Sequence, residues 1–248
     1  FCLTAPGSEK RFGIHSIAES VRPFLNVVWN SLLFSQPYLE KGKRASNPAL
    51  ETEDEWILSR LAACRDNVTK GLDEYAFQEC TQALFQFVNE DFSRTYIKLV
   101  RERVQGKTRK ALEQTLNHCM LSILRLLAPV APHYAEAVYQ DMRTPKLPES
   151  VHLLSLATPD RKRVDKKLNG EMQTVKEIAQ ACLALREEQK LRLRWPLEEL
   201  VLEAGKRPVK KLEGVLARMC NVKKVMHTTT KPAGTGMYAG KELKELTV

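Results

Sequence analysis

FQECTQALFQFVNEDFSRTYIKLVRERV, residues 77–104, is the longest regular helical pattern in this sequence of 248 residues. Apolar residues recur along it three and four positions apart, as they do on one face of an α-helix. The residues of this apolar stripe are Cys80, Leu84, Val88, Phe92, Tyr96 and Leu99. At about 100° per residue, Arg94, Lys98 and Arg101 fall within a narrow sector on the opposite side. The stretch therefore predicts a long helix with an apolar face for a core and a cationic stripe facing outward.

Similar patterns on both sides of this stretch predict further helices over residues 17–38, from Thr52 to about residue 73, over 108–127, and from Pro132 onward. Thr52 is expected to cap the second of these helices, since acidic residues follow it at once. The connections between the helices are short, which favours antiparallel neighbours. We expect a mainly α protein that begins with an up-and-down helical bundle and ends in a small α/β domain.

The domain boundary is predicted at RTPKLPESVHLLSLATPD, residues 143–160, where prolines replace the helical pattern. Residues 1–143 form the predicted bundle, and residues 144–164 form a linker that crosses outside it. Residues 165–226 carry a long helix followed by a strand, a helix and a strand, which predict the α/β domain. Residues 227–248 are left as a tail of uncertain order.

Composition limits the class of protein and its compartment. No apolar run approaches the length of a membrane-spanning helix, and the first residues do not resemble a signal peptide. The chain starts without Met, so we expect it to be a piece of a longer protein. The six cysteines lie far apart with no C-x-x-C spacing, which predicts reduced thiols, no metal site and a cytoplasmic location.

The formal net charge of +9 belongs mostly to the C-terminal third, where 20 Lys and Arg face 12 Asp and Glu from Pro159 onward. A positive surface attracts phosphate backbones, although an excess of this size also occurs on proteins that bind no nucleic acid.

We find no nucleophile with a base and no phosphate-binding loop, so no residue is predicted to be catalytic.

Two groups of residues are candidates for nucleic-acid contact. The first is the cationic stripe with its continuation, Arg94, Lys98, Arg101, Arg103, Lys107, Arg109 and Lys110. The spacing alone slightly favours a solvated helix face over contact with an RNA backbone.

The second group lies in LRLRWPL, residues 191–197. Arg192 and Arg194 alternate, as on one side of an extended segment. Trp195 either stacks on an unpaired base or fills the seam between the domains, and for this residue alone packing in the seam is favoured.

Six segments in a fixed order give the sequence a family resemblance. They are VRPFLNVVWNSLLF, DEWILSRL, FVNEDFSRTYIKLVRERV, LLAPVAPHYAEAVYQDM, ESVHLL and LRLRWPLEELVL. In this order they resemble the region after the catalytic core of class I isoleucyl-tRNA synthetases, in the archaeal and eukaryotic cytosolic branch. The resemblance covers about residues 11–225, and the order of the segments makes it more specific than any one of them.

The resemblance implies a helical bundle that binds the anticodon stem-loop of isoleucine tRNA. The family's HIGH-type and KMSKS-type catalytic signatures are absent from this sequence. The implied role is therefore to support ATP-dependent aminoacylation by a catalytic domain of the same parent chain, with no catalysis and no cofactor of its own. The tRNA-binding residues that we expect are Arg94, Lys98, Arg101, Arg103, Lys107, Arg192, Arg194 and Trp195.

Two departures and two alternatives qualify this expectation. The family's S-x-W-Y is replaced by Ser93-Arg94-Thr95-Tyr96, and SLATP stands where Trp-Pro is expected, so roles of those tryptophans do not carry over. A valyl- or leucyl-tRNA synthetase is the alternative within the class, and a basic helical protein-interaction module is the alternative outside it.

Our hypothesis is that Arg192, Arg194 and Trp195 brace the seam between the domains and present cations to the anticodon arm.

Overall fold

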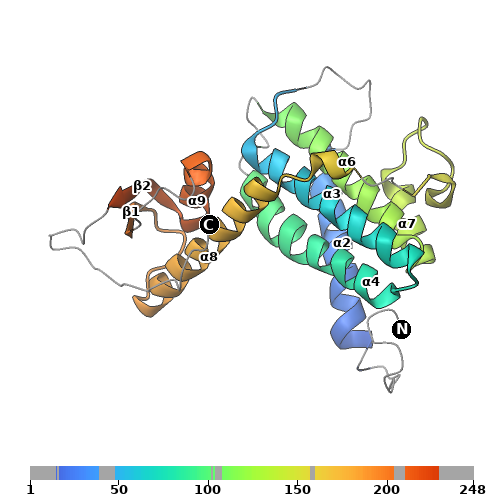
Figure 1. Cartoon of the computed structure of the whole chain (residues 1–248), viewed down its shortest axis with the longest axis horizontal. Coiled ribbons are helices and arrows are strands. Elements are labelled where there is room, and N and C mark those ends of the chain that lie inside the picture. Colours follow the sequence, from blue (N-terminus) through green and yellow to red (C-terminus); the bar gives the residue numbers. More distant parts are fainter. Residues whose placement is uncertain are drawn as a thin grey trace. The chain divides into compact units, whose positions relative to one another are not determined.

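The computed structural model describes His15 and residues 17–38, 48–101, 103, 108–156, 160–203 and 210–228. The chain forms two compact units, residues 1–164 and residues 165–248 (Figure 1). The second unit begins with the residue that precedes a long helix, α8, and the first unit holds the helices that come before it. The expectation of a mainly α protein with a small α/β part is confirmed.

The first unit is a bundle in which α3 packs against α4 and α6, and α6 packs against α2 and α7 (Figure 1). Its elements are η1 (Ile17–Val21), α2 (Arg22–Ser35), η2 (Gln36–Tyr38), α3 (Thr52–Asp73), α4 (Phe77–Gln86), η3 (Phe87–Ile97), α5 (Lys98–Val100), α6 (Arg109–Leu127), α7 (Pro132–Met142), η5 (Val151–Leu153) and η6 (Arg161–Arg163).

Large side chains of α3, η3 and α6 form the core of this unit. Trp56, Phe92 and Leu116 are each 1% exposed or less. The rings of Phe87, Phe92 and Tyr96 stack in series, with centroids 6.3 and 6.1 Å apart. Each such side chain contributes about 1.5–3 kcal/mol when it is fully buried, so this core holds the helices together.

The long helix expected over residues 77–104 is built from three pieces. α4 is followed by η3, which is a π-helix, and then by the short α5. Within η3 the Thr95 hydroxyl donates to the carbonyl oxygen of Glu90, five residues earlier, at 2.6 Å. The wider turn changes the angle between successive residues, so the assumption of 100° per residue is wrong for this segment. Arg94 lies inside η3, whereas Lys98 and Arg101 lie at and beyond its end.

The start of α3 also differs from the expected one. Thr52 is the first helical residue rather than the cap, and Glu51 precedes the helix in an extended conformation. The backbone N–H of Glu51 donates to Asp54 Oδ2 at 3.1 Å. The Asp54 carboxylate thus closes the first turn, which the sequence analysis assigned to Thr52.

The described parts of the segment predicted as a linker, residues 144–156 and 160–164, are held against the bundle. The Tyr139 hydroxyl donates to Pro148 O at 2.8 Å, and Glu136 Oε2 accepts from the Ser150 hydroxyl at 2.8 Å. Farther on, Arg161 Nε donates to Asp66 Oδ1 at 2.8 Å. These bonds explain why residues up to Val164 belong to the first unit.

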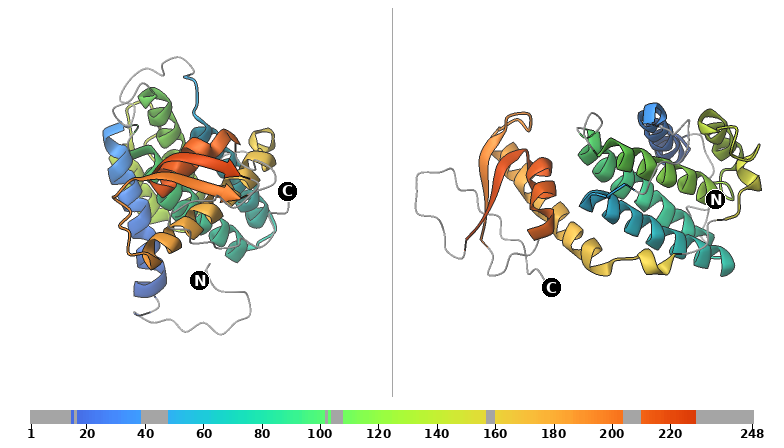
Figure 2. Two further views of the ribbon diagram at one scale, coloured as in Figure 1. Left: turned by 90° about the vertical axis from the view of Figure 1, so that its left-hand side faces the viewer. Right: turned by 90° about the horizontal axis from the view of Figure 1, so that it is seen from above.

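The second unit contains α8 (Lys166–Glu188), β1 (Leu197–Glu203), η7 (Lys210–Leu212), α9 (Glu213–Cys220) and β2 (Val222–Thr228). β1 and β2 are parallel, with Leu197 opposite Val222, and α9 lies between them in the chain (Figure 2). α9 packs against β2 and α8. A helix is the usual connection between parallel strands, so the unit is a small βαβ motif preceded by a long helix. β2 includes His227 and Thr228, which the sequence analysis placed in the tail.

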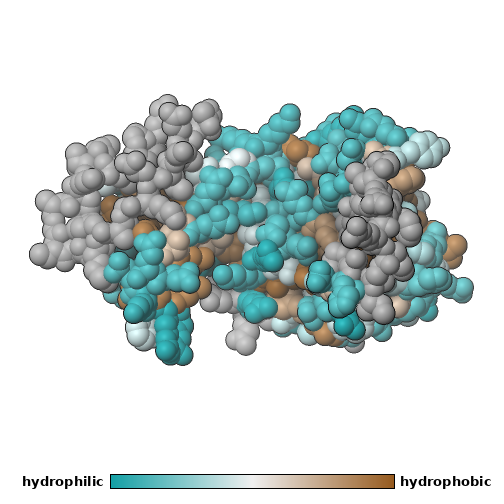
Figure 3. All heavy atoms as spheres, turned by 90° about the horizontal axis from the view of Figure 1, so that it is seen from below, coloured by the Kyte–Doolittle hydropathy of each residue, from teal (hydrophilic) through white to brown (hydrophobic). Residues whose placement is uncertain are grey.

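The face shown in Figure 3 is mostly hydrophilic where the structure describes it. Separate hydrophobic side chains lie between the hydrophilic ones, as is normal for folded proteins. In the part of the chain that the structure describes, no helix is both long enough and apolar enough to cross a membrane.

Candidate nucleic-acid interface

Two arginines lie over two aromatic rings at one end of the bundle. The Arg101 guanidinium is 5.9 Å from the centroid of the Phe34 ring, and that of Arg109 is 5.8 Å from the centroid of Tyr38. Both arginines are exposed, and both rings are partly exposed. We call Phe34, Tyr38, Arg101 and Arg109 the arginine–aromatic platform.

Four elements bring the platform together. Phe34 lies in the last turn of α2 and Tyr38 ends η2, whereas Arg101 follows α5 and Arg109 begins α6. The Phe34 and Tyr38 rings are themselves 5.8 Å apart. Arg109 Nε also donates to Glu113 Oε1 at 2.8 Å, which fixes its direction along α6. The packing of α2 against α6 therefore places residues from distant parts of the sequence on one surface.

Lysines lie beside the platform arginines. Lys98 is exposed and lies three residues before Arg101, on the same side of the chain. Lys110 is exposed and follows Arg109 at the start of α6. An aromatic ring offers a stacking surface to an unpaired base, and a guanidinium offers paired donors to a phosphate. The platform and these lysines therefore combine the two kinds of group that bind single-stranded nucleic acid.

Arg94 is exposed, but its guanidinium already forms an ion pair with Glu90. Its Nη1 lies 2.7 Å from Glu90 Oε1, and its side chain is 74% exposed. An exposed pair of this kind is worth only about 0.3–0.5 kcal/mol, so Arg94 can exchange Glu90 for a phosphate at small cost.

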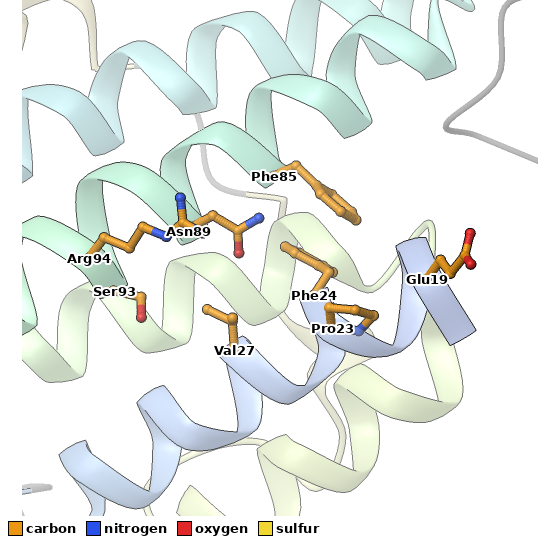
Figure 4. A pocket seen from close by; sticks show the side chains of 8 residues that line it. All are labelled: Glu19, Pro23, Phe24, Val27, Phe85, Asn89, Ser93 and Arg94. Carbon is orange, nitrogen blue, oxygen red and sulfur yellow. The ribbon is translucent and has the colours of Figure 1, made fainter. Parts of the chain in front are cut away.

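Arg94 also borders a hollow of about 350 Å³ between α2 and η3 (Figure 4). The rings of Phe24 and Phe85 stack there with centroids 3.6 Å apart. The lining residues are Glu19, Pro23, Phe24, Val27, Phe85, Asn89, Ser93 and Arg94. The lining of the hollow includes none of the platform residues.

Arg103 is buried and does not belong to any exposed cationic surface. Its side chain is 9% exposed, and Nη1 and Nη2 donate to Asp54 Oδ1 and Oδ2 at 2.9 and 2.8 Å. Nη1 also lies 3.2 Å from Glu53 Oε1, and Nε lies 3.2 Å from Thr108 Oγ1. The assignment of Arg103 to tRNA contact is therefore corrected: this arginine ties the end of α5 to the first turn of α3.

The electrostatics of this cluster agree with a structural role. Burial alone lowers the pKa of Arg103, but the bonds to Asp54 and the charge of Glu53 outweigh burial and raise that pKa. The Tyr96 hydroxyl donates to Asp54 Oδ1 at 2.7 Å. Burial, reinforced by the Asp54 charge, raises the pKa of Tyr96. Arg103 therefore stays protonated and Tyr96 stays neutral at neutral pH.

Lys107 lies outside the described residues. The remaining predicted residues, Arg192, Arg194 and Trp195, belong to the second unit, and all are exposed, with Trp195 at 52%. Their segment is a turn rather than an extended strand, because the Trp195 N–H donates to Arg192 O at 3.0 Å. The expectation that the arginines point to one side of an extended segment is therefore wrong.

Phe34 and Tyr38 were not predicted from the sequence as site residues. Their spacing of four residues at the end of a helix was the available signal, but nothing near them in the sequence indicated the arginines that cover them. Among the described residues, no group of three or more His, Cys, Asp or Glu side chains is arranged to hold a metal ion.

Comparison with known proteins gives the class of the chain. The family described as the anticodon-binding domain of tRNA ligase matches residues 54–202, which include most of the bundle, α8 and most of β1. The chain belongs to this family.

Curated relatives give a finer similarity. The chain is 36% identical over 235 residues to isoleucine–tRNA ligase of Methanopyrus kandleri, a match that covers 89% of this chain and 22% of the relative. Identity is 34% over 237 residues to isoleucine–tRNA ligase of Pyrococcus abyssi, covering 90% of this chain and 22% of the relative. Identity is also 34% over 234 residues to isoleucine–tRNA ligase of Archaeoglobus fulgidus, covering 90% of this chain and 23% of the relative. The chain thus spans less than a quarter of the length of these relatives and resembles isoleucine–tRNA ligases within that span.

Proposed function

We propose that this chain is the anticodon-binding part of an isoleucine–tRNA ligase and binds the anticodon arm of isoleucine tRNA. The observation that carries the proposal is the similarity to isoleucine–tRNA ligases along 89–90% of the chain. A catalytic domain elsewhere in the same protein uses ATP to attach isoleucine to the tRNA. The chain itself supplies binding energy and recognition, and needs no cofactor for that role.

The platform is the proposed contact of the first unit. Arg101, Arg109 and the neighbouring Lys98 bind phosphates of the anticodon loop, where several phosphates lie close together. Phe34 and Tyr38 provide rings on which an unpaired base stacks when it displaces a guanidinium from a ring face. A cation–π contact at an exposed site is worth only about 0.5–1 kcal/mol, whereas stacking of a base contributes about 1–3 kcal/mol. The exchange is therefore favourable.

The turn that carries Arg192, Arg194 and Trp195 is the proposed contact of the second unit. It combines two cations with a large ring that is 52% exposed, which is the same chemistry as the platform. The family match includes both this turn and most of the bundle, which supports a shared role for the two units.

A cytoplasmic location is part of the proposal. The described cysteines, Cys64, Cys80, Cys119, Cys182 and Cys220, are all free and buried. Free thiols are usual in a reducing compartment, where tRNA ligases act on their substrates.

The test is a fluorescence titration of the chain with a labelled anticodon stem-loop of isoleucine tRNA. A stem-loop of the same length with a changed anticodon is the control, and both are measured at about 50 and about 200 mM salt. We expect tighter binding of the cognate loop at both concentrations. Equal affinity for both loops would contradict recognition of the anticodon, and binding of neither would contradict the proposed function itself.

A matched pair of variants locates the contact. Arg101→Ala with Arg109→Ala removes two platform charges, and the control, Lys70→Ala with Arg161→Ala, removes two exposed charges elsewhere on the same unit. Each lost phosphate contact lowers the slope of log affinity against log salt by roughly 0.7 on a single strand. We expect a smaller slope for the platform variant only. A preference for valine or leucine tRNA in the same titration would instead support the alternative within the class.

A further inference from the structure

The turn at residues 192–195 is organised by one buried guanidinium. Arg186, in the last turn of α8, is 4% exposed. Its Nη2 donates to the carbonyl oxygens of Arg192 at 2.9 Å, Leu193 at 3.3 Å and Trp195 at 2.5 Å. Backbone acceptors from three of the four residues of the turn therefore converge on a single nitrogen.

The same arginine also joins the turn to α9. Arg186 Nη1 donates to Cys220 O, at the end of that helix, at 3.3 Å. Next along the chain, Asn221 Nδ2 donates to Leu193 O at 2.7 Å. Asn221 has φ 52°, and its carbonyl accepts from the Leu197 N–H at 3.1 Å, where β1 begins. The turn is thus held from α8 on one side and from the end of α9 on the other.

These bonds determine which groups reach solvent. Because the carbonyls of Arg192, Leu193 and Trp195 face Arg186, the side chains of the turn face away from it, and those of residues 192–195 are all exposed. A buried charge is costly unless its donors are satisfied. The hydrogen-bond partners of Arg186 among the described residues are neutral backbone carbonyls, and a leucine or methionine would fill the same space without that cost. The arginine therefore matters for the conformation of the turn more than for packing.

We propose that Arg186 is a positioning residue that holds residues 192–195 as a preformed RNA-binding turn. Arg186 does not touch the RNA. It fixes the directions of Arg192, Arg194 and Trp195, so that the two cations meet phosphates and the ring meets an unpaired base without a further loss of chain entropy on binding. This inference rests on the proposed function, since it names the part of the second unit that contacts the anticodon arm.

The variants separate positioning from direct contact. Arg186→Met removes the guanidinium donors to the turn, and Arg186→Lys keeps the charge but loses the fork that spans several carbonyls. Asn221→Gly removes the donor to Leu193 O, and glycine tolerates the left-handed backbone at this position. Arg192→Ala with Arg194→Ala removes the proposed contacts and leaves the brace in place.

The measurements are affinity for the anticodon stem-loop at several salt concentrations and amide hydrogen exchange of residues 191–197. For Arg186→Met we expect faster exchange in the turn and roughly tenfold weaker binding, with an unchanged salt slope, because no phosphate contact is lost. Arg186→Lys and Asn221→Gly are also expected to speed exchange in the turn and to weaken binding, but to a smaller extent. The variant without Arg192 and Arg194 keeps slow exchange but shows a smaller salt slope.

Several outcomes would overturn the inference. Unchanged affinity in an Arg186 variant whose turn exchanges faster means that order in the turn does not matter for binding. Slow exchange in Arg186→Met means that the arginine does not hold the turn. If Arg186→Met unfolds the second unit, Asn221→Gly and Arg186→Lys decide the question on the same two measurements. If the unaltered chain binds no stem-loop, the proposed function fails, while hydrogen exchange still reports separately whether Arg186 holds the turn.

Discussion

The guanidinium of Arg103 and the carboxylate of Asp54 form two hydrogen bonds, of 2.9 and 2.8 Å, although 49 residues separate them in the chain. Asp54 is 0% exposed, and its carboxylate also accepts from Tyr96 and from the backbone of Glu51. One side chain thus connects the start of α3, the π-helix η3 and the segment after α5. Arg101 of the platform lies two residues before Arg103, so this connection also anchors the segment that carries Arg101.

Replacing Arg103 with methionine is expected to lower the free energy of unfolding by about 3–5 kcal/mol. The loss arises because Asp54 and Glu53 stay buried without their cation. The loss of free energy is measured by urea denaturation monitored by circular dichroism. The control is Arg94→Ala, which breaks an exposed pair of similar length and should cost less than about 1 kcal/mol.

Combining Arg103→Met with Asp54→Asn is expected to cost at least about 1 kcal/mol less than the sum of the single changes. The amide still accepts from Tyr96, and no isolated carboxylate remains at position 54. Additive losses would mean that the two residues stabilise the fold independently.

Gly71 and Gly170 form a matched pair for testing helix packing. A Cβ at Gly71 meets Cys80 Cβ at 2.9 Å and Ala76 O at 3.2 Å, whereas a Cβ at Gly170 meets nothing within 4 Å. Gly71→Ala should therefore destabilise the protein by about 1–3 kcal/mol through overpacking at the α3–α4 turn. Gly170→Ala should stabilise it by about 0.5–1 kcal/mol, because alanine favours a helix interior. Thermal denaturation of both variants measures the difference, and equal shifts would contradict this account of the packing.

The parts of the fold that depend on short-range periodicity could be predicted from the sequence. Leu112, Leu116 and Ile123 recur at helical spacing, and all are buried in α6. The π-helix η3 could not be predicted in this way, because its backbone bonds join residues five apart, and the helix template assumes a different repeat. The apolar positions Val88, Phe92 and Tyr96 are buried in either geometry, so their pattern does not distinguish the two.

The candidate site was less accessible to sequence reasoning. A list of cationic residues does not show that Arg103 turns inward, because its partner Asp54 is distant in sequence. Nor does it show that Arg101 and Arg109 cover Phe34 and Tyr38, since the packing of α2 against α6 brings these residues together. In the same way, the alternation of Arg192 and Arg194 indicated an extended segment, whereas the bond from the Trp195 N–H to Arg192 O makes it a turn, which also accepts hydrogen bonds from Arg186.

The rings of the platform are expected to contribute to RNA binding independently of charge. Phe34→Leu with Tyr38→Leu should weaken binding of the cognate stem-loop by about fivefold or more, because a stacked base contributes about 1–3 kcal/mol. The salt slope should stay the same, since no cation is removed. Tyr38→Phe is the control and should bind as the unaltered chain does, because the ring remains. A loss in Tyr38→Phe as large as that in the leucine variant would mean that the hydroxyl, rather than the ring, contacts the RNA.

The buried thiols are expected to differ in reactivity. The hydrogen bond from Cys220 lowers the pKa of Cys182 to about 7, although burial opposes the shift. Burial raises the pKa of Cys64 to about 12 and raises that of Cys119 as well. Because the thiolate is the reactive form, iodoacetamide at about pH 8 should label Cys182 before Cys64 and Cys119 in the folded protein. Peptide mass spectrometry after short exposure gives the order, and earlier labelling of Cys64 would contradict it.

The same shift predicts how the stability of the second unit depends on pH. The pKa of Cys182 is lower in the folded protein, about 7, than the ordinary value of 9.0. The unfolded chain therefore binds more protons between these two values, and stability should rise as the pH increases from about 7 to about 9. The contribution is fully present above the unfolded pKa and disappears as the pH falls through the folded pKa. The rise is measured by urea denaturation at several pH values, in which hydrogen exchange of the α8 and α9 amides reports the unfolding of the second unit. Cys182→Ala should remove it, whereas Cys64→Ala, in the first unit, should leave it unchanged. A rise that persists in Cys182→Ala would assign the proton to another group.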